Sequence, residues 1–393
     1  MTNSPKGTSL WANTLIWSGA ALSIAEMQTG MYMAPLGLKT GLLAILLGHV
    51  IGCALLFGAG LIGARTRKSA METVKLSFGD KGGRIFALLN LLQLLGWTGI
   101  MIYEGALAAN ALLPTGQSLW AFALGLLIIL WLVLGLKRLS KLNTLAMSSL
   151  LLLTFLLSSQ LWQADPLTPL FGDDISFAMA LELSIAMPLS WLPLISDYTR
   201  EAESPVKAAA ISTIVYGLVS SWMYMIGLGA ALAYGESDMA QVMIKSGLGM
   251  AGLVIILLST VTTTFLDAYS AGVSSKSLSD RLNEKTVALA VTLCGTVGAI
   301  CLPLLDFSEF LYFIGSVFAP MIAVQFADYF LFGGHPRENF SWQNLALWLI
   351  GFIIYRFLMP LDLSVGSTLP AMAITLGLCV LTKRCFVRRS YTG

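Results

Sequence analysis

Two acidic side chains stand inside long apolar stretches of the sequence. Glu26 lies in SIAEMQTG (23–30) and Asp267 lies in TTTFLDAYSAG (262–272). A carboxyl group among apolar residues needs a partner or a proton, so it is a functional candidate by default. The alternative for Glu26 is a neutral, hydrogen-bonded acid with a packing role. The sequence thus indicates two carboxyls that could bind a donor group, a cation or a proton.

A polar stripe runs along the apolar segment over 82–110. Its members are spaced three or four residues apart and so share one face of a helix; they are Asn90, Gln93, Trp97, Met101 and Glu104. A polar stripe with a central tryptophan suits the wall of a cavity, where an aromatic ring can stack on a planar molecule. The competing interpretation is interhelical hydrogen bonding with the tryptophan as packing, and both stay open here.

Hydroxyl groups precede Asp267 in the segment over 247–276. They belong to Ser259, Thr262 and Thr263, which lie within one to two helical turns, and Asp267 comes about one turn later. Hydroxyl oxygens can join free backbone carbonyls as ligands of a small cation such as Na⁺. Serine and threonine also often bond back to their own helix, so this pattern alone is weak.

Constellations typical of metal or covalent catalysis are not visible. The five cysteines lack CxxC spacing, which argues against a zinc site or a disulfide framework. Only two histidines occur, so a metal-dependent membrane enzyme is not expected. We interpret His49, flanked by Gly48 and Gly52, as a point of close helix packing rather than as a proton relay.

The composition requires a membrane protein. The 393 residues are 56% hydrophobic and only 11% charged, whereas a soluble domain carries about 25% charged residues. The apolar residues fall in runs long enough to cross a bilayer as helices. We predict an all-α protein with twelve transmembrane helices, which lie over 9–37, 38–63, 82–110, 118–136, 141–163, 175–198, 205–234, 247–276, 286–303, 306–332, 342–359 and 367–385. The lipid bilayer is an expected partner, and nucleic acid is not.

Basic residues mark one side of the membrane. They gather in alternate loops, around Arg65, Lys137, Arg200 and Lys276, and near both ends of the chain. The other loops contain only two basic residues, Lys39 and Lys245. Because basic loops remain in the cytoplasm, we expect both termini there and place the protein, as a multi-pass protein, in a bacterial inner membrane.

The tetrapeptide Leu-Ser-Ile-Ala occurs at 22–25 and at 183–186, midway along the first and sixth predicted spans. These two spans run in opposite directions and are five spans apart, which is typical of inverted repeats with interrupted first helices. Polar residues at 26 and 28–30 would interrupt the first span, and Pro188 and Pro193 the sixth. The alternative is that the prolines merely kink a packed helix. We predict a first repeat over 9–163, a second over 175–332 and two further helices over 342–386.

Several motifs resemble the nucleobase–cation symporter family of cytosine, allantoin and hydantoin permeases. They are SDYTR (196–200), FAPMIAVQFADYF (318–330), TTTFLDAYSAG (262–272) and LLGWTG (94–99). The resemblance implies a LeuT-like core of five plus five helices with two additional C-terminal helices. It also implies a planar heterocycle held midway across the membrane, and symport with Na⁺ or H⁺ by alternating access. The protein would then be a transporter and not an enzyme, without an organic cofactor.

The resemblance also implies site residues. The substrate site would comprise Glu26, Gln28, Gln93, Trp97, Met101, Ser184, Trp191 and Asp267. A sodium site would comprise Thr262 and Thr263 with Ser259 and the carbonyl oxygens near Leu22 and Ala25. Where hydantoin-type relatives carry glutamine four residues after the tryptophan, this chain has Met101.

Three motifs are most similar to those of a bacterial branch of the family that is thought to carry hydroxymethylpyrimidine, an aminopyrimidine precursor of thiamin. They are SIAEMQTG, LLGWTG and TFLDAYSAG. A carboxyl can accept from an exocyclic amine and, with one proton, also bond the adjacent ring nitrogen. Two carboxyls therefore favour an amino-substituted heterocycle. Cytosine or a purine is the alternative substrate; a channel or a membrane sensor is a more distant one. The oligomeric state is left open.

Overall fold

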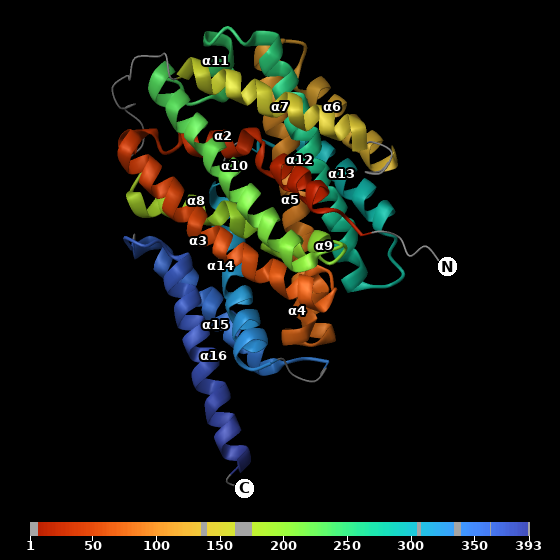
Figure 1. Cartoon of the computed structure of the whole chain (residues 1–393), viewed down its shortest axis with the longest axis vertical. Helices are drawn as coiled ribbons and strands as arrows, with labels where there is room; N and C mark the ends of the chain where they lie inside the picture. Colours follow the sequence, from red (N-terminus) through yellow and green to blue (C-terminus); the bar gives the residue numbers. More distant parts are fainter. Residues whose placement is uncertain are drawn as a thin grey trace.

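The computed structural model describes residues 7–134, 140–161, 175–304, 308–333, 339–361 and 363–391. Within these ranges the regular elements are helices, apart from one parallel bridge between Thr8 and Ala202. Figure 1 shows the helices packed side by side, with α15 and α16 at one edge. The helices are α1 (Leu10–Ala21), α2 (Ile24–Met31), α3 (Gly37–Thr66), α4 (Ala70–Phe78), α5 (Asp80–Leu112), α6 (Gln117–Leu134), α7 (Ser140–Leu161), α8 (Phe177–Ser190), α9 (Leu192–Thr199), α10 (Pro205–Tyr234), α11 (Met239–Lys245), α12 (Gly249–Leu278), α13 (Glu284–Cys301), α14 (Ser308–Phe326), α15 (Trp342–Leu358) and α16 (Thr368–Tyr391).

Nine helical stretches in the described residues are long and apolar enough to cross a membrane. Three of the twelve predicted spans fall outside this set: the broken pair α1–α2, and the helices α7 and α16. The protein is therefore an α-helical membrane protein, and the count of twelve crossings stays a prediction. Residues 162–174, which include the end of the fifth predicted span, lie outside the described ranges.

Apolar side chains cover the outside of the helices as well as the interior. Leu43, Val50 and Phe357 are among the large apolar residues that are mostly exposed. A helix in lipid gains nothing from a polar outer face, so both its faces are apolar and it lacks the one-sided pattern of a soluble helix.

The first predicted span is broken at Leu22 and Ser23. The α1 helix ends at Ala21 with Leu22 as its C-cap, and Ser23 has an extended backbone with φ −133° and ψ 156°. The Ser23 hydroxyl accepts a hydrogen bond from the backbone N–H of Glu26 at 3.2 Å and so caps α2. Our prediction that the polar residues at 26 and 28–30 form the interruption is wrong, because these residues lie inside α2. A serine cap, rather than the acid, sets the position of the break.

The sixth predicted span is broken at Trp191, between the two prolines. Trp191 ends α8 and begins α9, with φ −89° and ψ −8°. Pro193 lies in the first turn of α9, where its missing N–H costs no hydrogen bond. Pro188 lies one turn before the break, inside α8. The prolines thus flank an interruption, as predicted, instead of merely kinking one helix.

Each broken helix packs against a long helix of the other half of the chain. The pair α1–α2 contacts α10, and the pair α8–α9 contacts α3. Glycines permit the close approach. A β-carbon at Gly227 of α10 would lie 1.8 Å from the carbonyl oxygen of Met27, and one at Gly48 of α3 would lie 2.2 Å from the β-carbon of Ser184. Each half of the chain thus supplies the long helix that packs on the other half's broken helix, and the inverted repeats stay a prediction.

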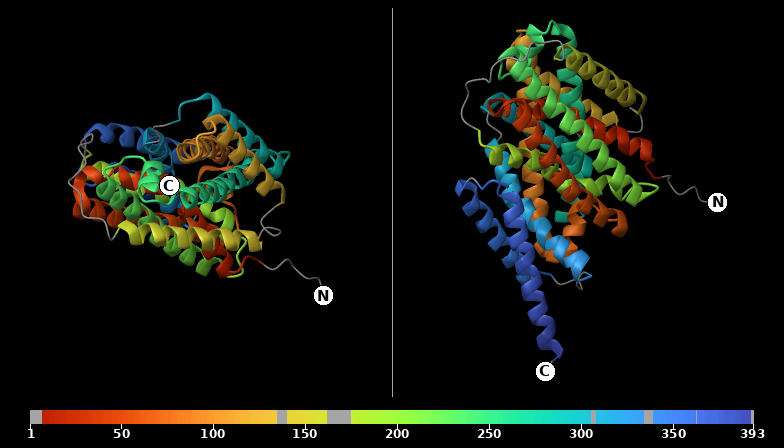
Figure 2. Two further views of the ribbon diagram at one scale, coloured as in Figure 1. Left: turned by 90° about the horizontal axis from the view of Figure 1, so that it is seen from above. Right: turned by 60° about the vertical axis from the view of Figure 1, so that its left-hand side comes forward.

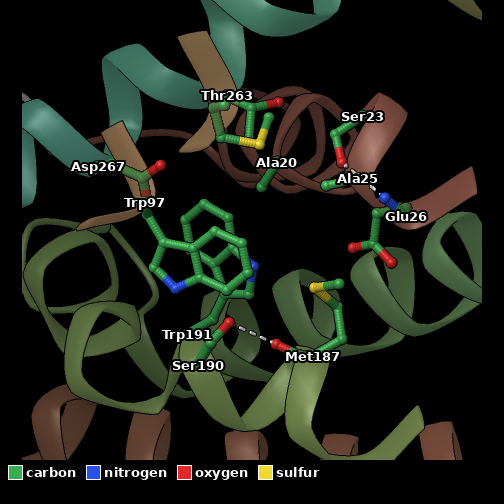
Figure 3. A pocket seen from close by; sticks show the side chains of 11 residues that line it. Ala20, Ser23, Ala25, Glu26, Trp97, Met187, Ser190, Trp191, Thr263 and Asp267 are labelled. Carbon is green, nitrogen blue, oxygen red and sulfur yellow. Dashed lines mark hydrogen bonds between the residues drawn. The ribbon is translucent and has the colours of Figure 1, made fainter. Parts of the chain in front are cut away.

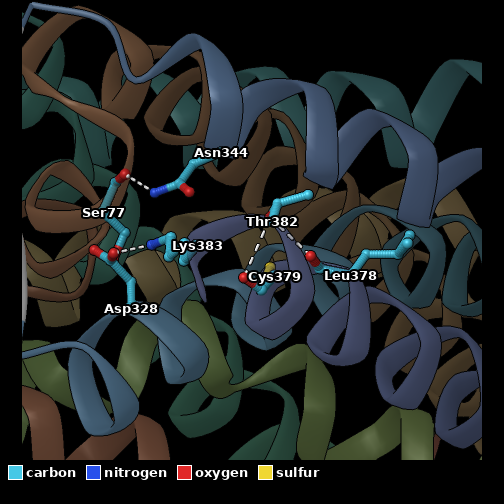
Figure 4. Close-up of polar contacts among 7 residues, drawn as sticks. All are labelled: Ser77, Asp328, Asn344, Leu378, Cys379, Thr382 and Lys383. Carbon is cyan, nitrogen blue, oxygen red and sulfur yellow. Dashed lines mark hydrogen bonds and ion pairs between the residues drawn. The ribbon is translucent and has the colours of Figure 1, made fainter. Parts of the chain in front are cut away.

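The last helices form a separate layer against α14. In Figure 2 α15 and α16 lie beside α14, and α16 projects beyond the other helices. Figure 4 shows a buried ion pair between Lys383 of α16 and Asp328, which follows α14. In the same view Asn344 of α15 donates to the carbonyl oxygen of Ser77 in α4 at 2.5 Å. These contacts fix the C-terminal pair to the core.

Candidate functional site

A cavity lies where the two helix breaks meet α5 and α12. The enclosed space within it is small, about 20 Å³. Figure 3 shows side chains from all four regions converging on it. The lining residues are Ala20, Ser23, Ala25 and Glu26 near the first break, Met187, Ser190 and Trp191 at the second, Trp97 and Met101 of α5, and Thr263 and Asp267 of α12.

Glu26 enters this cavity from the first turn of α2 and is firmly held. Tyr216 of α10 donates to Oε1 at 2.8 Å, and Ser220 of the same helix donates to Oε2 at 2.6 Å. The side chain is 1% exposed. Two hydroxyl donors from one neighbouring helix therefore fix its position before any ligand arrives.

Asp267 faces the same cavity from α12 without such support. Its side chain is 4% exposed, and it makes no hydrogen bond or ion pair with any residue that the structure describes. Figure 3 shows its carboxyl beside Trp97, on the far side of the cavity from Glu26. A buried carboxyl without a protein partner is costly, so it is suited to a ligand that supplies the missing partner.

Two indole rings form the apolar wall of the cavity. Trp191 is braced by Trp17 in an edge-on contact, with ring centroids 5.7 Å apart. Trp97 of α5 meets Phe310 of α14 edge-on at 5.4 Å. Rigid aromatic rings offer a flat surface on which a planar heterocycle can stack. Trp191, which the sequence predicted as a substrate ligand, lines the cavity.

The polar stripe of α5 serves two purposes along its length. Gln93 donates to the carbonyl oxygen of Ser190 at 3.1 Å, and Asn90 donates to that of Pro193 at 3.2 Å. The Ser190 carbonyl needs a partner because the N–H of Leu194 bonds instead to the carbonyl of Trp191. The N-terminal part of the stripe, at Asn90 and Gln93, therefore stabilises the helix break, as the hydrogen-bonding interpretation requires. Its middle, at Trp97 and Met101, lines the cavity.

The hydroxyls predicted for a sodium site differ in their contacts. Thr263 Oγ1 reaches across to the carbonyl oxygen of Gly19 in α1 at 3.1 Å. Thr262 bonds to the carbonyl of Leu258 at 2.8 Å, and Ser259 bonds weakly to that of Ile256 at 3.4 Å, both within their own helix. Leu22 lies at the break of the first span, and Ala25 lines the cavity. Thr263 is thus the hydroxyl that links α12 to the first broken helix.

Three predicted substrate ligands lie outside the cavity lining. Gln93 bonds to the carbonyl of Ser190 at the second break, as described above. Gln28 donates to the carbonyl oxygen of Ser237 at 2.6 Å. Ser184 bonds to the carbonyl of Ala180 within α8, on the side that packs against Gly48. The structure therefore does not bring Gln28 and Ser184 to the other candidates.

Sequence reasoning missed several residues around the cavity. Ala20, Ser23, Met187 and Ser190 line it, and Tyr216 and Ser220 hold Glu26 from behind. Ser23 carried a usable signal, since serine before an acid is a common start of a helix. No sequence pattern identified the hydroxyls of Tyr216 and Ser220, because they lie about 190 residues away from Glu26 in an otherwise ordinary apolar segment.

Comparison with known sequences gives matches that extend over most of the chain. A profile of the permease family for cytosine/purines, uracil, thiamine and allantoin matches residues 2–339. The cytosine permease of Escherichia coli (strain K12) is 26% identical over 336 residues, which are 84% of this chain and 80% of that permease.

Solved structures share the fold. Mhp1, a nucleobase-cation-symport-1 family transporter, in a closed conformation with bromovinylhydantoin bound, matches with a TM-score of 0.80 at 19% identity, over 98% of this chain and 94% of its own. Inward-facing Mhp1 matches at 0.76 with 18% identity, over 99% and 94%. A Na⁺-coupled sialic acid symporter in a substrate-bound outward-open state matches at 0.71 with 14% identity, over 95% and 88%.

The helix arrangement and the matched family agree. The fold is LeuT-like, and the chain is a membrane transporter and not an enzyme. It belongs to the nucleobase–cation symporter family, the permeases for cytosine/purines, uracil, thiamine and allantoin.

Proposed function

We propose that this symporter imports an amino-substituted pyrimidine, with cytosine as the first candidate, by cation symport and alternating access. The observation that carries the proposal is the unpartnered carboxyl of Asp267 beside two indole rings in a cavity between two helix breaks. Mhp1 shares this fold in both a closed and an inward-facing conformation, which supports alternating access for the fold.

The chemistry of the cavity favours an amine on a flat ring. The ring would stack on Trp97 and Trp191, and its exocyclic amine would donate to Asp267. A carboxyl that carries one proton also bonds the neighbouring ring nitrogen, giving a two-point contact. Uracil and hydantoin lack the exocyclic amine, so they would leave Asp267 without its partner.

Two amino-substituted pyrimidines compete as substrates. The curated relatives matched by this chain are named cytosine permeases, which favours cytosine over our first expectation of hydroxymethylpyrimidine. None of the comparisons supports the hydroxymethylpyrimidine branch. Hydroxymethylpyrimidine remains the second candidate because it presents the same exocyclic amine next to a ring nitrogen.

The coupling cation and the membrane setting form part of the same proposal. Na⁺ is one candidate, with Thr263 as a hydroxyl ligand near the carbonyls of the first break. H⁺ is the other. The repeat boundaries at 9–163, 175–332 and 342–386, the bacterial inner membrane and the cytoplasmic termini are likewise proposed from the sequence pattern.

Uptake by proteoliposomes tests the proposal. Purified protein is reconstituted and supplied with labelled cytosine, with unlabelled hydroxymethylpyrimidine, adenine, thiamin or uracil as competitors, under an imposed Na⁺ or H⁺ gradient. We expect saturable uptake driven by one gradient, with amino-substituted pyrimidines competing best. Equal competition by uracil would overturn the amine requirement, and uptake indifferent to both gradients would overturn symport.

A further inference from the structure

His49 lies directly behind Glu26 and is joined to it through one hydroxyl group. Ser220 Oγ lies 2.6 Å from Glu26 Oε2 and 2.7 Å from His49 Nε2. The second ring nitrogen, Nδ1, lies 2.8 Å from the carbonyl oxygen of Ile45, one turn earlier in α3. Glu26, Ser220 and His49 are all buried, with at most 3% of each residue exposed. We call these three side chains the Glu26 relay.

The available donors determine how many protons the relay holds. The Ile45 carbonyl can only accept, so His49 Nδ1 carries a hydrogen and a neutral His49 presents a bare Nε2 to Ser220. Ser220 has a single hydrogen, which an ionised Glu26 and a neutral His49 would both require. Both contacts are hydrogen bonds only if one more proton resides on Glu26 or on His49.

The charge balance favours keeping this proton. A protonated Glu26 with a neutral His49, and an ionised Glu26 with a protonated His49, both have no net charge. Loss of the proton would leave an uncompensated negative charge in the core, which is expensive. No lysine or arginine in the described ranges bonds to the relay.

The ionisable groups that face the relay from neighbouring helices add no positive charge. Glu182 of α8 is turned away from the cavity toward Tyr355 of α15. The groups near Glu26 or His49 are Cys53 of α3, Tyr216 and Tyr224 of α10, and Asp267 across the cavity. All of these are acids, phenols or a thiol, so His49 is the basic group of this environment.

We propose that the Glu26 relay is the binding site of a coupling proton, an inference that rests on the proposed function for its link to the substrate. In the transfer, the Glu26 O–H bond breaks as its hydrogen moves to Ser220 Oγ, and the original Ser220 hydrogen moves to His49 Nε2. The products are a carboxylate and an imidazolium, and no charge is gained or lost.

The transfer connects proton binding to substrate binding. Glu26 lines the cavity, so its carboxylate can accept a hydrogen bond from a substrate amine once the proton has moved to His49. The proton then stays inside the protein while the substrate occupies the cavity. This arrangement carries both across the membrane together. The close packing at Gly48 and Gly52, which we expected around His49, holds α3 and α8 together beside the relay.

Proton movement and substrate uptake are measured together in proteoliposomes that contain a pH-sensitive dye. In the wild type, uptake of labelled cytosine is expected to acidify the lumen. An acidic outer buffer is expected to raise the accumulation of cytosine inside the proteoliposomes. Ser220→Ala and His49→Gln are expected to lower this stimulation about tenfold, a typical coupling factor, while cytosine exchange persists. Ser220→Thr keeps the hydroxyl and should keep the stimulation.

Tyr216→Phe is the matched control, because it removes the donor to the other carboxyl oxygen. It should lower uptake and proton movement in the same proportion. Wild-type uptake driven by Na⁺ without proton movement would overturn the relay and leave the proposed function intact. An unchanged proton-to-substrate ratio in Ser220→Ala and His49→Gln would also overturn it.

A second readout needs no substrate and so stands even if none of the tested bases is transported. Infrared difference spectra between acidic and alkaline buffers should contain the C=O band of a protonated carboxyl that is missing in Glu26→Gln and displaced in Ser220→Ala. Asp267 remains in both variants and provides the internal reference. Identical spectra for wild type and Glu26→Gln would contradict the proton site.

Discussion

Glu26 and Asp267 face the same cavity from opposite walls, but only one of them is supported by the protein. Tyr216 and Ser220 supply hydrogen bonds to Glu26, whereas Asp267 has no partner among the described residues. Both are almost fully buried, so burial alone does not distinguish them. The difference indicates a division of roles, in which Glu26 is set in advance and Asp267 depends on what occupies the cavity.

Replacement of Asp267 should have the largest effect on binding. Asp267→Leu removes the proposed acceptor of the substrate amine, and we expect a loss of about 2–5 kcal/mol of binding free energy. The unliganded variant should be at least as stable as the wild type, because an unpaired buried carboxyl has been removed. Binding of labelled cytosine and the melting temperature in detergent measure the two effects. Wild-type affinity in Asp267→Leu would show that Asp267 does not bind the substrate.

Glu182 provides a third carboxyl, fully satisfied and remote from the cavity. It accepts hydrogen bonds from Tyr355 Oη at 2.5 Å, from the backbone N–H of Ser367 and Thr368, and from the Thr368 hydroxyl. Glu182→Ala leaves these donors unpaired, so we expect a loss of about 3 kcal/mol of stability. Thermal unfolding in detergent checks this. The folded fraction should retain the wild-type substrate affinity, and a large change in affinity would show that the comparison with Glu26 and Asp267 fails.

Tyr216→Phe should affect Glu26 moderately. It removes one of the two hydroxyl donors to Glu26, and a hydrogen bond contributes about 1 kcal/mol. We expect a loss of thermal stability smaller than that of Glu182→Ala, and a loss of cytosine affinity smaller than that of Asp267→Leu. If Tyr216→Phe weakened binding more than Asp267→Leu, the assignment of the two roles would be reversed.

Ser23→Ala should have the smallest effect, on the position of Glu26. The substitution removes the cap of α2 and should cost about 1 kcal/mol of stability. Ser23→Thr keeps a capping hydroxyl and serves as the control. Equal melting temperatures of Ser23→Ala and the wild type would show that the cap does not hold the break.

The sequence predicted the helices well because long apolar runs in a membrane protein have few alternatives. It also identified Glu26, Trp97 and Asp267, because acids and a tryptophan in a polar stripe are out of place in such runs. The position of the first break was wrong, because capping by Ser23 outweighed the polar residues that follow it. The orientation of Gln28 depends on the residue at which α2 begins, and that of Ser184 depends on which face of α8 packs against α3. Neither could be predicted from the sequence. Tyr216 and Ser220 reach Glu26 only through tertiary packing, which no local pattern reports.

A structure of the protein with cytosine bound would show whether Asp267 binds the exocyclic amine. We expect the ring between Trp97 and Trp191, with its exocyclic amine within hydrogen-bonding distance of Asp267. A ring bound away from the two indoles, with the Asp267 carboxyl still unpartnered, would contradict this expectation.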